Sequence, residues 1–485
     1  MELQFQNTPL RCLRCSASGN AETEQTLELR IGEDLPPVGR VLGAWGQPLI
    51  RGKEWRGDQV RVHGGVMARA LYEAEGADGI YAVEGWMPFQ LHWDLTDSHS
   101  DGKTVVSCCL SAMDARQIGA EKLMLRATVN ADLQAMEREE YPVYTPRDLP
   151  EDILVKMGSG MAHLPVEVGE TALSLEDEMT LPSGKTEVAR ILFYNLMPVV
   201  SDKKLMGDKM VFRGTAELCM VYLGADGRVH EYRTQLPISQ YGEMEQEYGP
   251  DAQLWVEPMV TDLELALLED GRIRLKTGVV GQYVVCDSFA MKTVQDAYST
   301  KREVTPQFQQ MTIPSVQKMY PKTVSLRQGM DCRAEQAVCA AVCARKGKAA
   351  VEGTIQALYY DPEGHLQFVS SPFAEEMTEY APSKVSLMAA GAEVVTNGGA
   401  VSVQAQIPLW VREVQAEEIA QVSALSVGES VVSDPNRPSL ILRRMGASGL
   451  WELAKHYGST EEKIRSANGL LEEPEMGRLL LIPVE

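Results

Sequence analysis

The sequence predicts a mainly β protein, with three antiparallel sandwich-like or barrel-like repeats followed by a small βααβ domain. One order of landmarks recurs about every 150 residues along most of the 485-residue chain, which is typical of a duplicated domain. Apolar and polar residues alternate with a period of two in short segments bounded by turn residues, which favours half-buried strands. Near the C-terminus the apolar residues change to a helical period.

Each repeat opens with an apolar–polar–apolar triplet and closes on a run of alternating apolar residues. The opening triplets are Leu27-Glu28-Leu29, Leu173-Ser174-Leu175 and Val324-Ser325-Leu326. The closing runs are Leu123/Leu125/Ala127/Val129, Ile273/Leu275/Thr277/Val279 and Val401/Val403/Ala405/Ile407. Because successive strand side chains face opposite sides, these runs predict strands with one buried face.

A glycine and a tyrosine mark the strand that enters a hairpin in each repeat. Gly64-Gly65, Gly214 and Gly353 are followed by Tyr72, Tyr222 and Tyr359, and each tyrosine precedes a glycine-containing turn. The turns are Glu73-Ala74-Glu75-Gly76, Gly224-Ala225-Asp226-Gly227 and Asp361-Pro362-Glu363-Gly364. Glycine adopts positive φ readily, so these turns predict three equivalent hairpins. We expect the tyrosines to be partly buried, with each hydroxyl bonded to a polar group or water.

A proline follows each hairpin, in Met87-Pro88-Phe89, Leu236-Pro237-Ile238 and Ser371-Pro372-Phe373. Proline cannot donate to an interior ladder, so we expect the three prolines at equivalent strand-start or edge positions. A further hairpin then closes on Gly119, Gly271 or Gly398-Gly399.

These landmarks divide the chain into four domains and three linkers. Residues 137–166, with four prolines, and 287–318 are less regular, and for Asp296–Lys301 two interpretations stay open: a free linker, or packing on a neighbouring repeat. The predicted division is 1–136, 167–286 and 319–416 for the repeats, 137–166, 287–318 and 417–435 for the linkers, and 436–485 for the last domain.

Charge and hydropathy argue against binding to nucleic acid or anionic lipid and against a membrane span. The chain has 46 Lys and Arg against 68 Asp and Glu, and its net charge of −22 repels nucleic-acid phosphates and anionic lipid. The N-terminal residues show no basic segment followed by an apolar run, so we expect no signal peptide and a cytoplasmic origin. No stretch reaches the roughly 18 apolar residues of a membrane span.

Residues that would carry catalysis or metal binding show no recognisable pattern. The nine cysteines are irregularly spaced, so we expect reduced thiols, and the lone pair Cys12 and Cys15 fits an N-terminal strand better than a metal or redox site. The seven histidines fall at unrelated landmarks, and no HExxH, GxSxG or phosphate-binding glycine motif occurs. We therefore expect no enzymatic activity, no catalytic residue, no metal and no cofactor.

The last 46 residues or so predict a strand, two helices and a strand. Leu440-Ile441-Leu442 favours a strand, and Leu450 to Gly458 shows apolar residues at helical spacing that stop at a glycine. Ser459 or Thr460 can cap a second helix, and Leu479 to Pro483 favours a closing strand. Trp451 and Tyr457 share the helical spacing, so we expect them in the core rather than stacked on a sugar.

This segment resembles the LysM pattern at Leu450-Trp451, Ala454, Tyr457-Gly458, Ile464, Asn468, Gly477, Leu479 and Ile482-Pro483. LysM modules bind glycans that contain N-acetylglucosamine between two loops. The resemblance therefore implies a glycan- or partner-binding site at Gly446, Ala447, Ser448, Gly449, Leu450, Asn468, Gly469, Leu470 and Leu471. The usual Gly-Asp-Thr is replaced here by Gly446-Ala447-Ser448-Gly449, which is one residue longer and lacks the acid.

The repeats, with Asp296-Ala297-Tyr298-Ser299-Thr300-Lys301 between them and the LysM-like tail behind, resemble the SPOCS-domain spore-coat proteins of spore-forming Firmicutes. The resemblance implies a morphogenetic scaffold in the mother-cell cytoplasm, at the forespore or spore surface. Its expected partners are spore-coat or coat-basement proteins, with no nucleic acid and no membrane span. The alternative is a cell-wall protein that binds peptidoglycan or cortex glycan.

Overall fold

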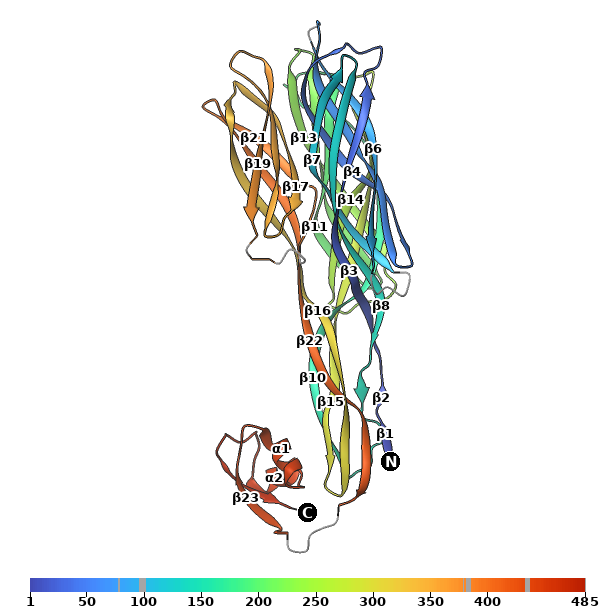
Figure 1. Ribbon diagram of the computed structural model, residues 1–485, viewed down its shortest axis with the longest axis vertical. Helices are drawn as coiled ribbons and strands as arrows, with labels where there is room; N and C mark the ends of the chain where they lie inside the picture. Colours follow the sequence, from blue (N-terminus) through green and yellow to red (C-terminus); the bar gives the residue numbers. More distant parts are fainter. Residues whose placement is uncertain (77–78, 96–101, 378, 381–384, 432–436, 485) are drawn as a thin grey trace.

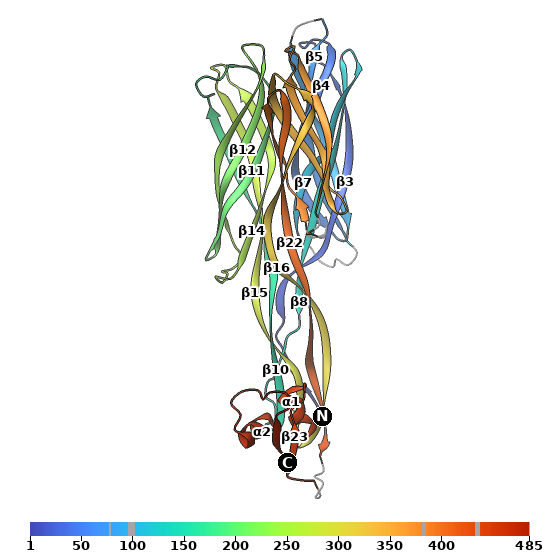
Figure 2. The ribbon, with the colours of Figure 1, turned by 90° about the vertical axis from the view of Figure 1, so that its left-hand side faces the viewer.

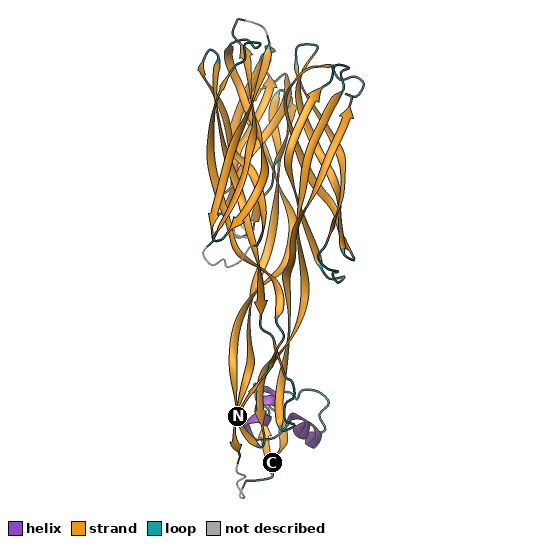
Figure 3. Cartoon of the chain, turned by 90° about the vertical axis from the view of Figure 1, so that its right-hand side faces the viewer, coloured by secondary structure: helices purple, strands orange, loops and turns teal. Residues whose placement is uncertain are grey.

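The computed structural model describes residues 1–76, 79–95, 102–377, 379–380, 385–431 and 437–484. It is an elongated molecule, with three β-sheet heads at one end, a long twisted stalk of strands, and a small unit beside the far end of the stalk (Figure 1). Within the described residues, helix occurs only in that small C-terminal unit, and the rest is almost entirely antiparallel strand (Figure 3). The chain is therefore mainly β, as its period-two pattern predicts.

The first head consists of two three-stranded antiparallel sheets that enclose one core. Its sheets are β3-β8-β7 and β4-β5-β6. The core draws apolar side chains from both sheets, including Val66 and Phe89 from one and Leu110 and Leu125 from the other. The strands are β3 (Leu10–Arg30), β4 (Val38–Arg56), β5 (Gln59–Ala74), β6 (Ile80–Asp94), β7 (Lys103–Gly119) and β8 (Lys122–Tyr141).

The second and third heads follow the same path through two facing sheets, and Figure 2 shows all three heads grouped at one end. The second pairs β10-β15-β14 with β11-β12-β13, and the third pairs β16-β22-β21 with β17-β18-β19. Their strands are β10 (Ile153–Met179), β11 (Val188–Met206), β12 (Lys209–Gly224), β13 (Val229–Glu243), β14 (Gln253–Leu267), β15 (Ile273–Ser299), β16 (Arg302–Arg333), β17 (Gln336–Lys346), β18 (Ala350–Tyr360), β19 (Leu366–Glu376), β20 (Val385–Leu387), β21 (Gly391–Asn397) and β22 (Ala400–Ser430).

The repeated glycines occupy one structural position in all three heads. Gly64, Gly214 and Gly353 lie opposite Phe89, Ile238 and Phe373, the residues that follow the repeated prolines. A Cβ atom on any of the three would come within 2.2 Å of a backbone carbonyl oxygen on the neighbouring strand. Only glycine allows that approach, so the repeated glycine has a steric cause.

The repeated prolines also superimpose in register, opposite Gly65, Thr215 and Thr354. They lie inside β6, β13 and β19, each of which pairs on one side only. The prolines are therefore at edge positions, as predicted, rather than at strand starts.

The three tyrosines sit near the end of the strand that enters each hairpin, as predicted. Each lies opposite the last residue before a β-bulge in the adjacent strand, namely Val41, Ile191 and Ala337. Tyr72 and Tyr222 are fully buried, whereas Tyr359 is half-buried. Tyr72 donates a hydrogen bond to the carbonyl oxygen of Pro36 at 3.0 Å. The Tyr222 hydroxyl meets no hydrogen-bonding group of the protein within the described residues.

The opening triplets lie on the first strand of each head, but not all at one register. Leu175 pairs with Thr277 and Leu326 with Ala405, the third position of the closing run in each case. Leu27 pairs with Leu125, the second position, and Leu29 with Leu123, the first. The triplet chosen in the first repeat is therefore not structurally equivalent to the other two, but is displaced along the first strand. Apolar–polar alternation alone does not distinguish positions that are two residues apart.

The segments predicted as linkers are mostly strands. Residues 137–166, 287–318 and 417–435 include the ends of β8, β15 and β22 and the beginnings of β10 and β16. These strands run past the heads and form the stalk (Figure 1). The prolines of residues 137–166 favoured a linker there, yet Pro165 pairs with Cys286 within an antiparallel ladder. Small cores inside the stalk, for example around Val294, Ala297 and Val422, hold these strands together.

The three heads are joined by buried polar contacts. The Gln47 side chain donates to the Leu196 carbonyl at 2.8 Å and accepts from the Leu196 amide at 3.0 Å. Gln282 makes the same reciprocal pair with Val106, at 2.8 and 3.0 Å. Lys346 of the third head binds the buried carboxylate of Asp132 of the first at 2.6 Å. Unmade buried hydrogen bonds are costly, so these pairs fix one arrangement of the heads.

The described chain ends in a two-stranded sheet, β23-β24, and two helices, α1 and α2. At the other end of the chain, two short strands near the N-terminus pair with strands of the stalk region. β1 lies against β22, and β2 lies against β9. The bounds are β1 (Glu2–Gln4), β2 (Gln6–Asn7), β9 (Tyr144–Thr145), β23 (Leu440–Arg444), α1 (Gly449–His456), α2 (Glu461–Asn468) and β24 (Leu479–Pro483). No helix in the described part of the chain is long and apolar enough to cross a membrane.

Candidate functional site

The C-terminal unit, residues 437–484, folds locally because its helix ends and its sheet are satisfied within it. Thr460 accepts a hydrogen bond from the Lys463 amide at 3.1 Å and so caps α2, which ends at Gly469 in the left-handed conformation at φ 59°. Ser448 does not cap α1. The Glu473 carboxylate does so instead, by accepting from the Leu450 amide at 3.0 Å.

Glu473 links the first loop of the predicted site to α2, the helix that precedes the second loop. One loop is Gly446 to Leu450 and the other is Asn468 to Leu471. Glu473 reaches the start of α1 and also accepts from Arg465 of α2 at 2.7 Å. The amide at the start of α1 therefore already has an acceptor, so it is not a free donor for a ligand.

The predicted residues divide into exposed and structural ones. Gly446, Ala447, Ser448 and Gly469 are exposed, Gly449 and Leu470 are half-buried, and Leu450 is fully buried. Leu471 is 98% exposed.

Asn468 holds the unit together rather than facing a ligand. Its amide donates to the Leu481 carbonyl at 2.6 Å and accepts from the Leu481 amide at 2.8 Å, which satisfies the free edge of β24. The same amide nitrogen also donates to Ile464 at 2.8 Å. A side chain with all these partners has little left to offer a sugar.

An exposed apolar surface, which we call the leucine face, lies on the outer side of the β23-β24 sheet. Leu442 and Leu481 pair across the two strands and are 55% and 37% exposed. Leu440 and Leu479 flank them with 52% and 49% exposure. Sequence reasoning assigned these positions only to strands. Their alternation with buried Leu480 and Ile482 is the signal that separates an inner face from an outer one.

The inner side of the unit is docked on the end of the stalk. Trp451 of α1 is 8% exposed, and its ring meets Tyr298 of β15 edge-on, with centroids 4.8 Å apart. Leu154 of β10 packs against the same core. Trp451 is thus a core residue, as predicted. The core spans two parts of the chain.

Polar contacts complete this docking. The buried carboxylate of Asp296 accepts from the Trp451 indole at 2.8 Å and from the Lys455 ammonium at 2.7 Å. Tyr298 donates to the Ser459 carbonyl at 2.9 Å. Burial raises the pKa of Asp296, but the bonds from Lys455 and Trp451 outweigh that effect and leave its pKa below the ordinary value. Within the segment Asp296–Lys301, Asp296 and Tyr298 therefore pack on the C-terminal unit, whereas Ala297 packs in the core of the stalk.

The arginines next to the first strand of the unit lie at its surface. Arg443 donates to the Tyr457 hydroxyl at 2.7 Å, and Arg444 donates to the Gly477 carbonyl at 3.1 Å. Both side chains remain exposed. They border the leucine face with positive charge.

The cysteines are free thiols, and most are buried. Cys12 is buried and Cys15 exposed on β3, and burial raises the pKa of Cys12 to about 12. A thiol with a raised pKa is a poor nucleophile and metal ligand at neutral pH. Over the described ranges no group of three His, Cys, Asp or Glu side chains is arranged to hold a metal ion.

Residues 187–268 match the family model described as SipL, SPOCS domain. The matched segment contains β11, β12, β13 and β14, which are four of the six strands of the second head. This head is thus similar to a SPOCS domain, and the similarity points to a role connected with sporulation. Comparison of the chain with curated proteins gave no match, and neither did comparison with solved structures.

Proposed function

We propose that this protein is a non-enzymatic scaffold of spore-coat assembly, which recruits coat proteins through its β-sheet heads and docks through a C-terminal LysM module. The observation that carries the proposal is the SPOCS match on the second head. The first and third heads follow the same strand path, and their glycines and prolines share its register. Three related heads on one body offer several binding surfaces at fixed spacing.

The packing of the heads supports a rigid scaffold. Buried reciprocal pairs, such as Gln47 with Leu196 and Gln282 with Val106, join heads that lie far apart in the sequence. Scaffolds that hold partners in fixed positions need such rigidity, since each flexible joint adds an entropic cost when partners bind.

For the C-terminal module, the contacts favour a protein partner over a glycan. The Leu450 amide and the Asn468 side chain, which lie in the predicted glycan loops, already have partners within the unit. The leucine face is apolar, exposed and bordered by Arg443 and Arg444. Exposed apolar sheet surfaces with a charged rim are typical of protein interfaces, so we propose an acidic coat or coat-basement protein as the partner.

The second candidate function is binding of peptidoglycan or cortex glycan. One observation favours it: Gly446, Ala447 and Ser448 of the first predicted loop are exposed, and Leu471 of the second is 98% exposed. An apolar side chain beside exposed backbone is a suitable floor for a sugar ring.

Two variants of the full chain separate the candidates. The double substitution Leu442→Glu with Leu481→Glu places charge on the leucine face, whereas Leu471→Glu changes only the predicted glycan groove. Fluorescently tagged protein is followed in sporulating cells, and purified protein is sedimented with insoluble peptidoglycan. We expect the native protein in the mother cell at the forespore surface, loss of this location in the double variant, and normal location of Leu471→Glu.

A different pattern favours the alternative. Sedimentation of the native protein with peptidoglycan, abolished by Leu471→Glu and kept by the double variant, would establish the glycan reader. A uniform cytoplasmic signal of native protein throughout sporulation would remove the coat role altogether.

A further inference from the structure

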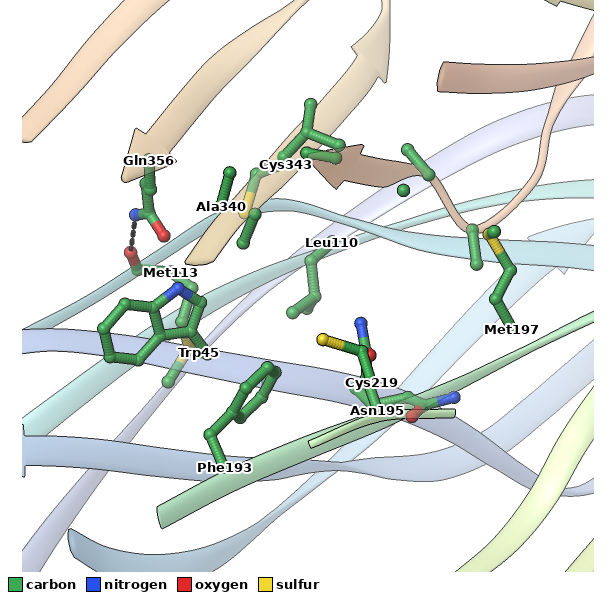
Figure 4. A pocket seen from close by; sticks show the side chains of 18 of the residues that line it. Trp45, Leu110, Met113, Phe193, Asn195, Met197, Cys219, Ala340, Cys343 and Gln356 are labelled. Carbon is green, nitrogen blue, oxygen red and sulfur yellow. Dashed lines mark hydrogen bonds between the residues drawn. The ribbon is translucent and has the colours of Figure 1, made fainter. Parts of the chain in front are cut away.

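The faces where the three heads meet are occupied by contacts within one chain. The Ser107 hydroxyl of the first head, for example, donates to the buried Glu257 carboxyl group of the second. The cavity in Figure 4, which Trp45, Phe193 and Cys219 help to line, has a volume of about 90 Å³. Pockets that bind ligands are several times larger, at about 300–1,000 Å³. These faces are therefore used inside one copy, and a surface for a second copy is better sought on the stalk.

One edge of the stalk is open. β10 pairs with β15 on one side, and no described strand pairs with its other side. The open part, residues 157–161, is called here the stalk edge. Met157 and Met161 are 43% and 50% exposed, and Ser159 and Gly160 between them are exposed as well. Glycine has no side chain, so the exposure of Gly160 means that the backbone itself is accessible.

The ladder shows which backbone groups face the open side. β10 and β15 pair without a register shift from Met157 to Pro165, so the direction of the β10 amides alternates with a period of two. The His163 amide points away from β15, because it donates to the Ser315 hydroxyl at 3.0 Å. Pro165, which has no N–H to donate to β15, lies two residues further on. The amides that point to the open side are therefore those of Met157, Ser159 and Met161.

The stalk edge lacks the protection that another one-sided strand of the stalk has. β16 pairs with β22 alone, and it contains Pro306, Pro314 and Pro321. A proline offers no N–H to a further strand, and prolines on edge strands prevent pairing between molecules. Residues 157–162 of β10 contain neither a proline nor a charged residue. This segment is therefore suited to pair with an added strand.

The sequence of the stalk edge is a palindrome, Met157-Gly158-Ser159-Gly160-Met161. When a strand pairs with a second copy of itself across a two-fold axis, residue i faces residue j and residue j faces residue i. With the axis at Ser159, methionine faces methionine, glycine faces glycine, and the serine faces its own copy. The outward amides and carbonyls then form about six hydrogen bonds between the copies. Self-complementarity of this kind favours a second copy of the chain over an unrelated strand.

We propose that two copies of this protein associate through the stalk edge, with their β10 strands antiparallel and centred on Ser159. The exposed Met157 side chain of each copy contacts Met161 of the other. The pairing ends before His163, whose amide already has an acceptor in its own chain. β10 runs from the stalk into the second head, so the heads of the two copies lie at opposite ends of the pair.

The proposal goes beyond the proposed function, because it concerns the assembly of the chain and not what the heads or the C-terminal unit bind. A ladder of five residues buries less than the roughly 1,200 Å² of a stable interface. We therefore expect a weak dimer whose population rises with protein concentration.

The first test compares two double variants of the full-length protein at the same two positions. Met157→Lys with Met161→Lys brings two ammonium groups together in each cross-strand pair, whereas Met157→Glu with Met161→Lys brings opposite charges together. Sedimentation velocity over a range of protein concentrations measures the dimer. We expect the native protein and the Glu/Lys variant to dimerise, and the Lys/Lys variant to dimerise at least about tenfold more weakly, because like charges on directly opposed residues repel.

The two variants control for each other. Both positions are exposed on a strand edge, so both variants should unfold at the same temperature as the native protein. A native protein that stays monomeric at every concentration, or equal dimerisation of the two variants, would overturn the proposal.

Cysteine cross-linking locates the axis. Ser159 faces its own copy in the proposed pair, with Cα atoms about 5.5 Å apart, which is within disulfide range. Ser159→Cys should form a covalent dimer under diamide oxidation faster than the native protein, whose exposed thiol is Cys15. Ser174→Cys is the control, because Ser174 is also exposed on β10 but lies outside the stalk edge, and it should cross-link at the native rate. Equal rates for the two variants would overturn the assigned register.

Discussion

The heads and the stalk are made from the same continuous strands, yet different interactions hold them. In the head, the first residues of β15 are completely buried at alternate positions, as Ile273 and Leu275 show, because a second sheet covers that face. In the stalk, the early residues of β16 alternate only between half-buried and exposed. The backbone ladder continues through both regions. The comparison teaches that head stability depends on packing between sheets, whereas the stalk depends on its ladder and a few small cores.

The largest expected difference between the two regions comes from adding one methyl group. In Gly214→Ala the new Cβ meets the Val199 carbonyl oxygen at 1.9 Å, so the strands must separate. We expect a loss of about 2–3 kcal/mol in the free energy of unfolding, the usual cost of overpacking a core. Chemical denaturation of the purified variant measures it.

The matched stalk substitution is Gly160→Ala, where the nearest atom to the new Cβ is the Met291 terminal carbon at 3.8 Å. That variant should retain native stability or gain slightly, because alanine is less flexible than glycine in the unfolded chain. Equal losses in both variants would show that head and stalk do not differ in packing.

The repeated glycines and prolines of the heads were visible in the sequence for the same reason. Positions such as Gly64, Gly214 and Gly353 are restricted by a close carbonyl, and Pro88, Pro237 and Pro372 by an edge, so they repeat visibly. Among the described stalk residues no glycine lies this close to a backbone carbonyl oxygen, so no landmark repeats there, and these segments were predicted as linkers. A weakly buried strand carries little periodic signal, although its ladder is as regular as that of a head.

The two helices of the C-terminal unit were predicted in outline because helix caps and helical spacing are local signals. Thr460 and Gly469 occupy the cap positions of α2. The partners of the predicted site residues could not be found in this way. Glu473 and Asp296 act across loops or across 155 residues of chain, as the Trp451 contact shows. Long-range pairs leave no period in a single sequence.

The docking of the C-terminal unit extends the comparison to a third region, since it depends on one buried carboxylate. In Asp296→Ala the Trp451 indole and the Lys455 ammonium lose their shared acceptor. We expect the docked state to weaken by about 2 kcal/mol, a typical value for charged hydrogen bonds. Hydrogen exchange of the α1 amides should accelerate. Asp287→Ala on the same strand is the control, and acceleration there as well would point to general loosening of the stalk.

Acidity should loosen the same contact. The pKa of Asp296 is lowered in the folded protein from the ordinary 3.8, so its ionised form stabilises docking at higher pH. That contribution is present above the unfolded pKa and is lost as pH falls through the lower folded value. Exchange of α1 should therefore stay constant from neutral pH down to about 5 and increase only below about 4, after correction for intrinsic rates. Loosening near pH 6 would implicate another group.

Protein stability at the junction of the heads should decrease as pH rises, whereas the docking contact at Asp296 weakens as pH falls. Burial raises the pKa of Glu257 to about 7 from 4.5, so the folded protein holds a proton that the unfolded chain releases between these values. Stability therefore falls as pH rises from about 4.5 to about 7. Glu257→Gln removes this term, so the stability of the variant relative to the native protein should increase by about 3 kcal/mol between pH 4.5 and pH 8.

The smallest expected changes in stability come from the equivalent tyrosines of the first and second heads, Tyr72 and Tyr222. Tyr72 donates to the Pro36 carbonyl at 3.0 Å, so Tyr72→Phe should cost about 1 kcal/mol by leaving that bond unmade. Tyr222 buries its hydroxyl without a partner in the part of the chain described, so Tyr222→Phe should be neutral or stabilising, because it removes an unpaired polar group. Denaturation midpoints of the two variants measure the contrast. If Tyr222→Phe costs as much as Tyr72→Phe, an ordered water satisfies the Tyr222 hydroxyl, and the two heads treat this position alike.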